Sequence, residues 1–190
     1  MNIFEKFLIS KEVSIKDGEL KVDQQRIMFL PANFWSLYSL NFKNNFQETA
    51  KIYKSVKEGL SGFSMPLGKK YGLSVKDFLD RWVKYCAFGG LGIVEYKLIE
   101  NDYGFLSIKD LSSHIYLKKI GIKEPLDIMW EGIIAGSLSN TFNKDVHVIE
   151  SKCICNGSDM CIFNWGSKEY LMTKFSDLVY KRFGVGNGFP

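Results

Sequence analysis

The sequence predicts an α+β fold in which an antiparallel sheet packs against helices. Short runs of alternating apolar and polar residues come in pairs around turn residues, which is the pattern of β-hairpins. Longer segments with apolar residues at helical spacing lie between these pairs. The order along the chain is hairpin, helices, hairpin, helix, hairpin, helix, whereas a parallel α/β fold would alternate single strands with helices.

The N-terminal half is predicted to contain one hairpin and three helical segments. Asp17-Gly18 is a turn signal that separates the two strands of the hairpin. Asn33 and Ser74 are residue types that cap helix N-termini, and each precedes a helical segment. The predicted strands are 12–16 and 20–30, and the predicted helical segments are 34–43, 46–60 and 75–88.

The middle of the chain is predicted to form a second hairpin and a long helix. The hairpin strands, 91–99 and 103–108, flank Asn101-Asp102, and residues 112–120 are ambiguous. The helix begins at Pro125 and runs to about Phe142, with Pro in the first turn where it is tolerated. Its many small residues predict close packing against a strand, a twin helix in a dimer or a ligand.

A third hairpin and a last helix complete the predicted fold. Residues 146–153 and 160–165 are the predicted strands, and Asn156-Gly157 is the turn signal between them. Ser167 is the expected N-cap of a helix over 168–183. We expect a single domain over 1–190, with the N-terminal hairpin and helices in 1–90 and the C-terminal helix at 168–183.

Composition and charge limit the classes of partner. The net charge is +4 and the lysines are scattered, so neither a nucleic acid nor a membrane is an expected partner. The N-terminus lacks the features of a signal peptide, and a cytoplasmic location is expected. The 15 Phe, 9 Tyr and 4 Trp residues indicate a Phe-rich core, an apolar interior with room for a ligand or a large dimer face.

The cysteine-rich segment of the third hairpin is the strongest functional signal. Cys153, Cys155 and Cys161 surround the Asn-Gly turn, and Glu150 lies just upstream. Three interpretations remain open: thiolates and a carboxylate that bind zinc, a disulfide across the hairpin, or buried apolar fillers. Glu150 and Cys153 are three residues apart and would face opposite sides of a regular strand, so their convergence requires a bulge or a strand end between them.

The segment from about Phe105 to Trp165 resembles the 4-vinyl reductase domain family of small-molecule-binding domains. The similarity extends to a wider fold that includes haem-based nitric-oxide sensors and vesicle-tethering (TRAPP) subunits, which pair through helices. It implies a family-like core at 104–166. The matching residues are Gly132-x-x-Ala135-Gly136 on the helix, Glu150-x-x-Cys153 at the strand end, Gly157 in the turn, and Cys161-Ile-Phe163.

The resemblance implies a structural zinc site and a function in ligand binding. Glu150, Cys153 and Cys161 occupy the positions of zinc ligands in the phenol-sensing activators of this family. Asp127 stands where those proteins have a cysteine at the helix start, so it is the expected fourth ligand, with Cys155 as the alternative. The two histidines, His114 and His147, are expected to be surface or core residues, His147 also being a candidate partner of a ligand residue.

The expected function is binding of a small hydrophobic, aromatic or hydrocarbon ligand by a homodimeric stand-alone sensor or carrier. No nicotinamide or flavin fingerprint is present, so we expect no enzyme and no catalytic residues. The alternatives are a reductase or accessory factor acting on a tetrapyrrole vinyl group, and a protein-assembly module. The residues expected to line the ligand pocket are Phe88, Tyr96, Phe105, Trp130 and Phe142.

Overall fold

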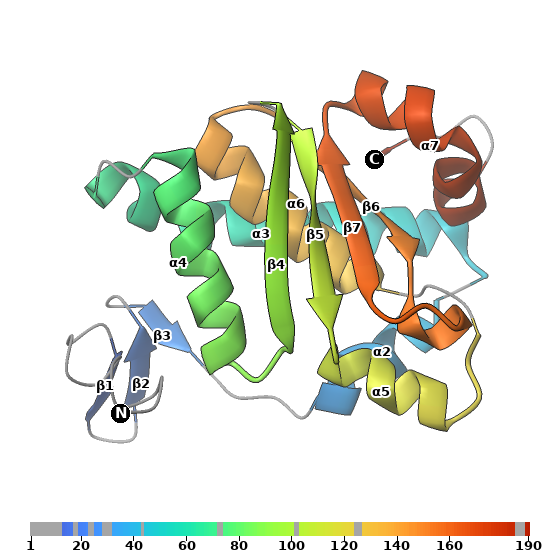
Figure 1. Ribbon diagram of the computed structural model, residues 1–190, viewed down its shortest axis with the longest axis horizontal. Helices are drawn as coiled ribbons and strands as arrows, with labels where there is room; N and C mark the ends of the chain where they lie inside the picture. The colour runs from blue at the N-terminus through green and yellow to red at the C-terminus, as the bar shows by residue number, and fades with distance from the viewer. Residues whose placement is uncertain are drawn as a thin grey trace. The chain divides into compact units, whose positions relative to one another are not determined.

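The chain divides into two compact units, Met1–Pro31 and Ala32–Pro190. The boundary falls inside the N-terminal part that the sequence analysis grouped as 1–90, and a single domain over 1–190 stays a prediction. The computed structural model (Figure 1) describes residues 13–16, 19–22, 25–27, 32–42, 44–71, 74–100, 103–123, 127–184 and 189–190.

The first unit contains a small antiparallel sheet. Its strand order is β1-β2-β3, and Val13 of β1 lies opposite Val22 of β2. The predicted N-terminal hairpin is therefore confirmed, but its second run forms two strands instead of one. The turn residues Asp17 and Gly18 lie outside the described residues. The strands are β1 (Val13–Lys16), β2 (Glu19–Val22) and β3 (Gln25–Ile27).

The second unit is built on a four-stranded sheet with the order β4-β5-β7-β6, in which all neighbours are antiparallel. The predicted α+β class is confirmed, and so are the two hairpins that supply these strands. The strands are β4 (Ile93–Glu100), β5 (Tyr103–Lys109), β6 (His147–Lys152) and β7 (Cys161–Gly166).

Helices cover one face of this sheet, where α3 and α6 lie behind the strands in Figure 1. α7 packs against β6 and β7, and α5 packs against α2. The helices are α2 (Ala32–Leu40), α3 (Phe46–Tyr71), α4 (Val75–Phe88), α5 (Ser112–Lys119), α6 (Ile128–Phe142) and α7 (Lys168–Phe183).

Two of the predicted N-caps are confirmed and one is wrong. The Ser74 hydroxyl accepts a hydrogen bond from the backbone N–H of Asp77 at 3.2 Å, and Ser167 caps α7 in the same way. Both helices consequently have the predicted bounds. Asn33 instead lies inside α2, which begins at Ala32.

Helix lengths differ from the predictions where tertiary packing decides them. α3 was expected to end near Leu60, yet it continues to Tyr71. The ambiguous segment 112–120 forms α5. α6 begins at Ile128, and the preceding Pro125 lies outside the described residues. Propensity is a weak guide in such segments because contacts with the rest of the fold override it.

The small residues of α6 let it pack very closely against α3. A Cβ atom on Gly132 would lie 3.0 Å from the carbonyl oxygen of Tyr53, and one on Gly136 would overlap the carbonyl oxygen of Lys57. The close partner is therefore a helix of the same chain, which is none of the three partners that the sequence suggested. Glycine is required here for the close approach of the two backbones.

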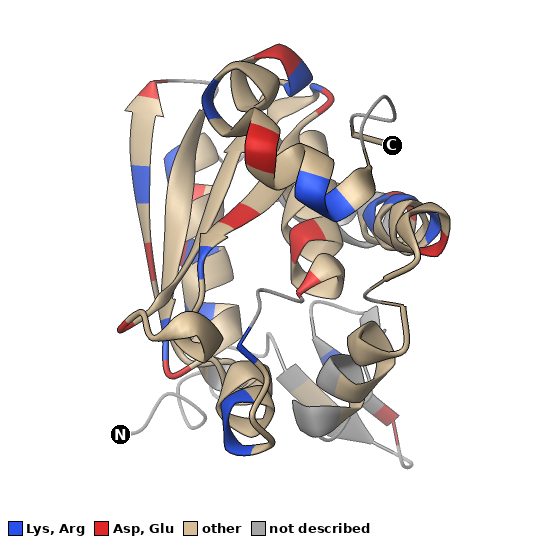
Figure 2. Ribbon diagram, turned by 90° about the vertical axis from the view of Figure 1, so that its right-hand side faces the viewer, with Lys and Arg blue, Asp and Glu red and all other residues tan. Residues whose placement is uncertain are grey.

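Charged residues are distributed over many elements. Figure 2 shows Lys, Arg, Asp and Glu side by side on helices and strands, without a broad area of one sign in that view. Within the described part of the chain, no helix has the length and apolar character needed to cross a bilayer.

Candidate metal centre

Four buried side chains converge between α5 and the β6–β7 hairpin. His114, Glu150, Cys153 and Cys161 each offer one ligand atom, and these atoms all lie within 4.8 Å of one another. Each residue is at most 1% exposed. The structure therefore brings together three of the predicted ligands, Glu150, Cys153 and Cys161, and adds His114, which the sequence analysis had assigned to the surface or core.

The end of β6 turns Cys153 toward Glu150. The pairing of β6 with β7 shifts between Glu150 and Lys152, and the strand ends at Lys152. The chain thus contains both the irregularity and the strand end that the alternation of side chains required. Cys153 then begins the short 3₁₀ helix η1 (Ile154–Asn156), and its Sγ accepts a hydrogen bond from the backbone N–H of Cys155 at 3.3 Å.

Asp127 holds the nitrogen of His114 that points away from the other ligand atoms. Asp127 Oδ2 lies 2.6 Å from His114 Nδ1, and Ser113 Oγ donates to the same oxygen at 3.3 Å. His114 Nε2 lies 3.2 Å from Glu150 Oε1. Burial has the largest single effect and lowers the pKa of His114, but several contacts, led by the Asp127 carboxylate, raise it, and the net pKa is raised. A carboxylate on Nδ1 fixes the ring orientation and directs Nε2 at the centre of the group.

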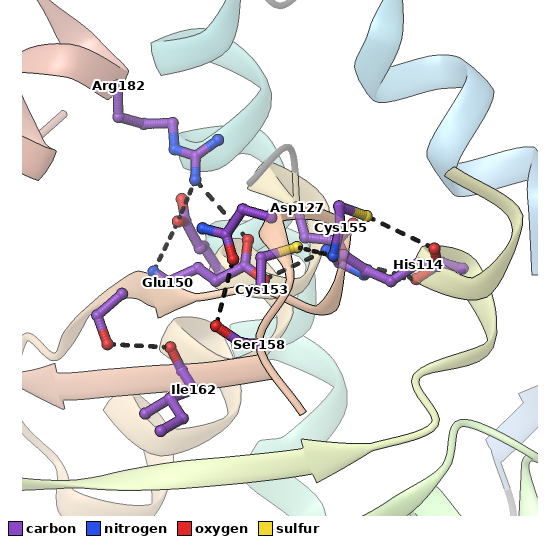
Figure 3. A network of polar contacts seen from close by, with 12 residues as sticks. His114, Asp127, Glu150, Cys153, Cys155, Ser158, Ile162 and Arg182 are labelled. Atoms are coloured by element: carbon purple, nitrogen blue, oxygen red, sulfur yellow. Dashed lines mark hydrogen bonds and ion pairs between the residues drawn. The ribbon is translucent and has the colours of Figure 1, made fainter. Parts of the chain in front are cut away.

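An arginine of α7 reaches the opposite side of the group. In Figure 3 the Arg182 side chain descends toward Glu150, and its Nη2 lies 3.1 Å from Glu131 Oε1 and 3.9 Å from Glu150 Oε2. The same Glu131 oxygen accepts a hydrogen bond from the Glu150 backbone N–H at 2.9 Å. Burial raises the pKa of Glu131 to about 7, although the Arg182 guanidinium opposes this rise. Arg182 therefore links α7 to β6 and α6.

The three thiols of the hairpin are in different environments. Cys155 donates its thiol hydrogen to the His114 carbonyl oxygen at 3.5 Å, so its sulfur is directed at the backbone of α5 (Figure 3). Hydrogen bonding to Cys155 lowers the pKa of Cys153, but hydrogen bonding to Cys161 and burial raise it to about 12. Hydrogen bonding to Cys153 lowers the pKa of Cys161. None of the four cysteines in the chain is in a disulfide.

The group has the electrostatic character of a cation site. His114 Nε2 and both carboxylate oxygens of Glu150 are buried without a hydrogen bond among the described residues, and their polar contacts there are the ion pairs of Glu150 with His114 at 3.2 Å and with Arg182 at 3.9 Å. Asp127, Glu131 and Glu150 are buried carboxylates, and Arg182 is their cationic neighbour besides His114. Buried charges need compensation, and unpartnered buried polar atoms are costly. A metal ion would satisfy both needs, so the residues present fit one.

The residues predicted to line an apolar pocket are spread over the second unit. Tyr96 and Phe105 are one register step apart on neighbouring strands, so their side chains leave opposite faces of the sheet. Trp130 lies in the first turn of α6 and Phe142 in its last. The side chain of Phe88 lies outside the described residues. The pocket itself stays a prediction.

An open cavity of about 520 Å³ lies between α3 and the connection from α6 to β6. Polar and charged residues line it, among them Lys54, Lys57, Asn143 and Asp145, and none of the four predicted pocket residues with described side chains does. Lys57 Nζ and Asp145 Oδ1 form an ion pair at 2.5 Å within it. This cavity differs in character from the apolar pocket expected from the sequence.

The chain is similar in sequence to a known protein. No family model matches the chain. The uncharacterized protein MJ1460 of Methanocaldococcus jannaschii is 29% identical over 155 residues, which are 79% of this chain and 86% of that protein.

Three solved structures are each similar to between 71% and 90% of the chain. A vinyl-4-reductase family protein from Methanocaldococcus jannaschii has a TM-score of 0.47 at 20% identity, covering 87% of this chain and 94% of that one. A trafficking protein particle complex subunit 3 from Naegleria fowleri, covalently bound to palmitic acid, has a TM-score of 0.45 at 15% identity, covering 71% and 93%.

The third structure gives the strongest similarity of the three. It is the phenol-responsive sensory domain of the transcription activator PoxR with phenol, with a TM-score of 0.70 at 14% identity, covering 90% of this chain and 92% of that chain. The resemblance inferred from the sequence is thereby confirmed at the level of the fold: the chain has the α+β fold of the PoxR sensory domain.

Proposed function

We propose that the chain is a small-molecule-binding domain, acting as a sensor or carrier, whose third hairpin is held in place by a structural zinc ion. The observation that carries the proposal is the convergence of His114, Glu150, Cys153 and Cys161 in a fully buried group. The fold shared with a sensory domain that responds to phenol supports the binding function.

Zinc is the metal that this donor set fits best. Two thiolates, an imidazole nitrogen and a carboxylate oxygen are all common zinc ligands, and four protein ligands complete a tetrahedral shell without water. A closed shell is typical of structural sites rather than catalytic ones. The ion would join α5 to the β6–β7 hairpin, with Glu150, Cys153 and Cys161 as ligands, His114 as the fourth, and Asp127 orienting His114.

The ligand that we propose is small and hydrophobic, either aromatic or a hydrocarbon. Trp130 is 6% exposed, and its indole N–H has no hydrogen-bond partner among the described residues. A ligand with an acceptor oxygen would satisfy this donor while filling apolar space around the ring. The other predicted contacts, Phe88, Tyr96, Phe105 and Phe142, are part of the same proposal, as are a homodimeric state and a cytoplasmic location.

Elemental analysis of the purified protein, combined with a count of free thiols, tests the metal. We expect about one zinc per chain and cysteines that become reactive only after a chelator removes the metal. A metal-free protein in which two thiols are missing would instead indicate a disulfide across the hairpin. That result would contradict the zinc site but would leave the binding function to be tested separately.

Thermal unfolding of the metal-loaded protein tests ligand binding. Phenol, other small aromatic compounds and medium-chain hydrocarbons are added over a range of concentrations. A ligand that binds the folded state alone raises the unfolding midpoint as its concentration increases. Trp130→Phe keeps an aromatic ring but removes the pyrrole part of the indole with its N–H, so it should weaken the response to phenols more than the response to hydrocarbons. The absence of any response across all three compound classes would contradict the binding proposal.

A further inference from the structure

The outer edge of the four-stranded sheet has a self-complementary pattern of side chains. β4 is the first strand of the sheet, and among the described strands it pairs with β5 alone. An edge strand leaves a row of backbone N–H and C=O groups free to pair with another chain. Natural edges are often protected by charged residues, so the arrangement of those charges decides whether a second strand is excluded or accepted.

One face of β4 is exposed along its length. Alternate side chains of a strand lie on the same face, and on the other face Val94, Tyr96 and Leu98 are buried or half-buried. The exposed row consists of Ile93, Glu95, Lys97 and Ile99. Its two ends are apolar and unusually accessible, because Ile93 is 59% exposed and Ile99 is 49% exposed.

The two charges in the middle of this row have no opposite charge within their own sheet. Glu95 lies across from Ser107 on β5, and Lys97 lies across from Phe105. Neither Glu95 nor Lys97 forms an ion pair with any residue that the structure describes. Their charges are therefore available to a strand placed along the other side of β4.

We propose that β4 is an interface between two copies of this chain, which pair antiparallel about a two-fold axis at Tyr96. This register places Glu95 opposite Lys97 of the second copy, and the symmetry forms the same pair a second time. Moving the axis by one residue in either direction places two Glu95 side chains or two Lys97 side chains opposite each other. Cross-strand pairs of opposite charge stabilise a ladder and like pairs destabilise it, so the charges select one register.

The apolar ends of the row agree with this register. Pairing about Tyr96 brings Ile93 next to Ile99 of the second copy, so two exposed isoleucines become neighbours at each end of the interface. The pairing of β4 with β5 is irregular between Leu98 and Glu100. A bulge bends a strand and ends regular pairing, so the regular part of the interface ends at Leu98 and the Ile93–Ile99 contacts lie at its margins. The inference rests on the homodimeric state proposed above and is independent of the zinc site and of ligand binding.

Charge reversal at the two positions tests the proposal in the full-length protein. Sedimentation equilibrium is measured for the wild type, Glu95→Lys, Lys97→Glu and the double variant. The wild type should approach twice the chain mass of 21.8 kDa. Each single variant creates two like-charged pairs and should weaken dimerisation on the order of tenfold or more, whereas the double variant restores opposite pairs and should dimerise like the wild type.

Lys174→Glu on the exposed surface of α7 is the matched control, because it makes the same charge change away from β4 and should leave the dimer intact. Circular dichroism verifies that each variant is folded. Three results would overturn the proposal: a wild type that stays monomeric at the highest concentration, a dimer that is insensitive to both single changes, or a double variant that remains as weak as the single ones. Faster amide exchange at residues 93–98 in the single variants would support it.

Discussion

Replacing Cys161 by alanine is expected to remove the bound metal and to lower the free energy of unfolding by more than about 4 kcal/mol. The Cys161 sulfur is one of the four convergent ligand atoms and is completely buried. Its loss leaves Glu150 and Cys153 in a buried site without the cation that compensates them, and uncompensated buried charge is strongly destabilising. Elemental analysis measures the metal, and urea unfolding measures the stability.

Cys86→Ala is the control for this experiment. Cys86 is also buried and free, but it lies on α4 and outside the convergent group. The substitution removes a small packing volume, so a loss of about 1 kcal/mol with full metal content is expected. If Cys161→Ala retains its metal, Cys161 is not a ligand and the proposed site is wrong.

The identity of the fourth ligand follows from three further variants. His114→Ala should lose the metal, whereas Cys155→Ala should keep it because the Cys155 thiol points at the His114 carbonyl oxygen. Asp127→Asn should weaken metal affinity roughly 10- to 100-fold, as expected for a residue that orients a ligand. Retention of metal by His114→Ala together with complete loss in Asp127→Asn would support Asp127 as the direct ligand.

Substituting Gly136 by alanine is expected to destabilise the protein by about 1–3 kcal/mol, although alanine is the better helix former by about 1 kcal/mol. The added Cβ would overlap the Lys57 carbonyl oxygen and would lie 3.0 Å from the Leu60 Cβ. Because the obstacle includes backbone, relief requires α3 and α6 to separate. Urea unfolding at equilibrium measures the change.

Gly59→Ala provides the opposite expectation in the same pair of helices. Gly59 lies in the exposed part of α3, and a Cβ at this position would meet nothing within 4 Å. The substitution should therefore stabilise the protein by up to about 1 kcal/mol through helix propensity. If the two glycine variants change stability in the same direction, the close approach of α6 to α3 does not explain the need for glycine.

Much of the fold could be predicted because its signals are local. A serine that caps its own helix acts over three residues, which is why the bounds of α4 and α7 were correct. The hairpins were recognisable from alternation and turn residues. The end of α3 could not be predicted, because the continuation of the helix past Leu60 depends on packing against other elements. The partner of the Gly132 and Gly136 surface depends on the same long-range packing.

The candidate site also has residues that could be predicted from local sequence and residues that depend on long-range packing. Glu150, Cys153 and Cys161 could be predicted because they lie in one short segment with a recognisable turn. His114 could not, since it lies on a helix whose own sequence was ambiguous, and no spacing connects it to the cysteines. Asp127 was singled out by its position, but its contact with His114 Nδ1 depends on how α5 meets the start of α6. Hydrogen-bond geometry of this kind has no signature in the sequence.

The uneven spacing of the proposed ligands has a consequence for the denatured ensemble. Cys153, Cys155 and Cys161 stay close together in an unfolded chain, whereas His114 must close a long loop to reach them, at an entropic cost that grows with loop length. The denatured protein is therefore expected to retain some affinity for thiophilic cations through its cysteines alone. Any binding to the denatured state subtracts from the stabilisation that the metal gives to the native one. When the protein is denatured in the presence of excess zinc, a fraction of the denatured chains should still bind metal.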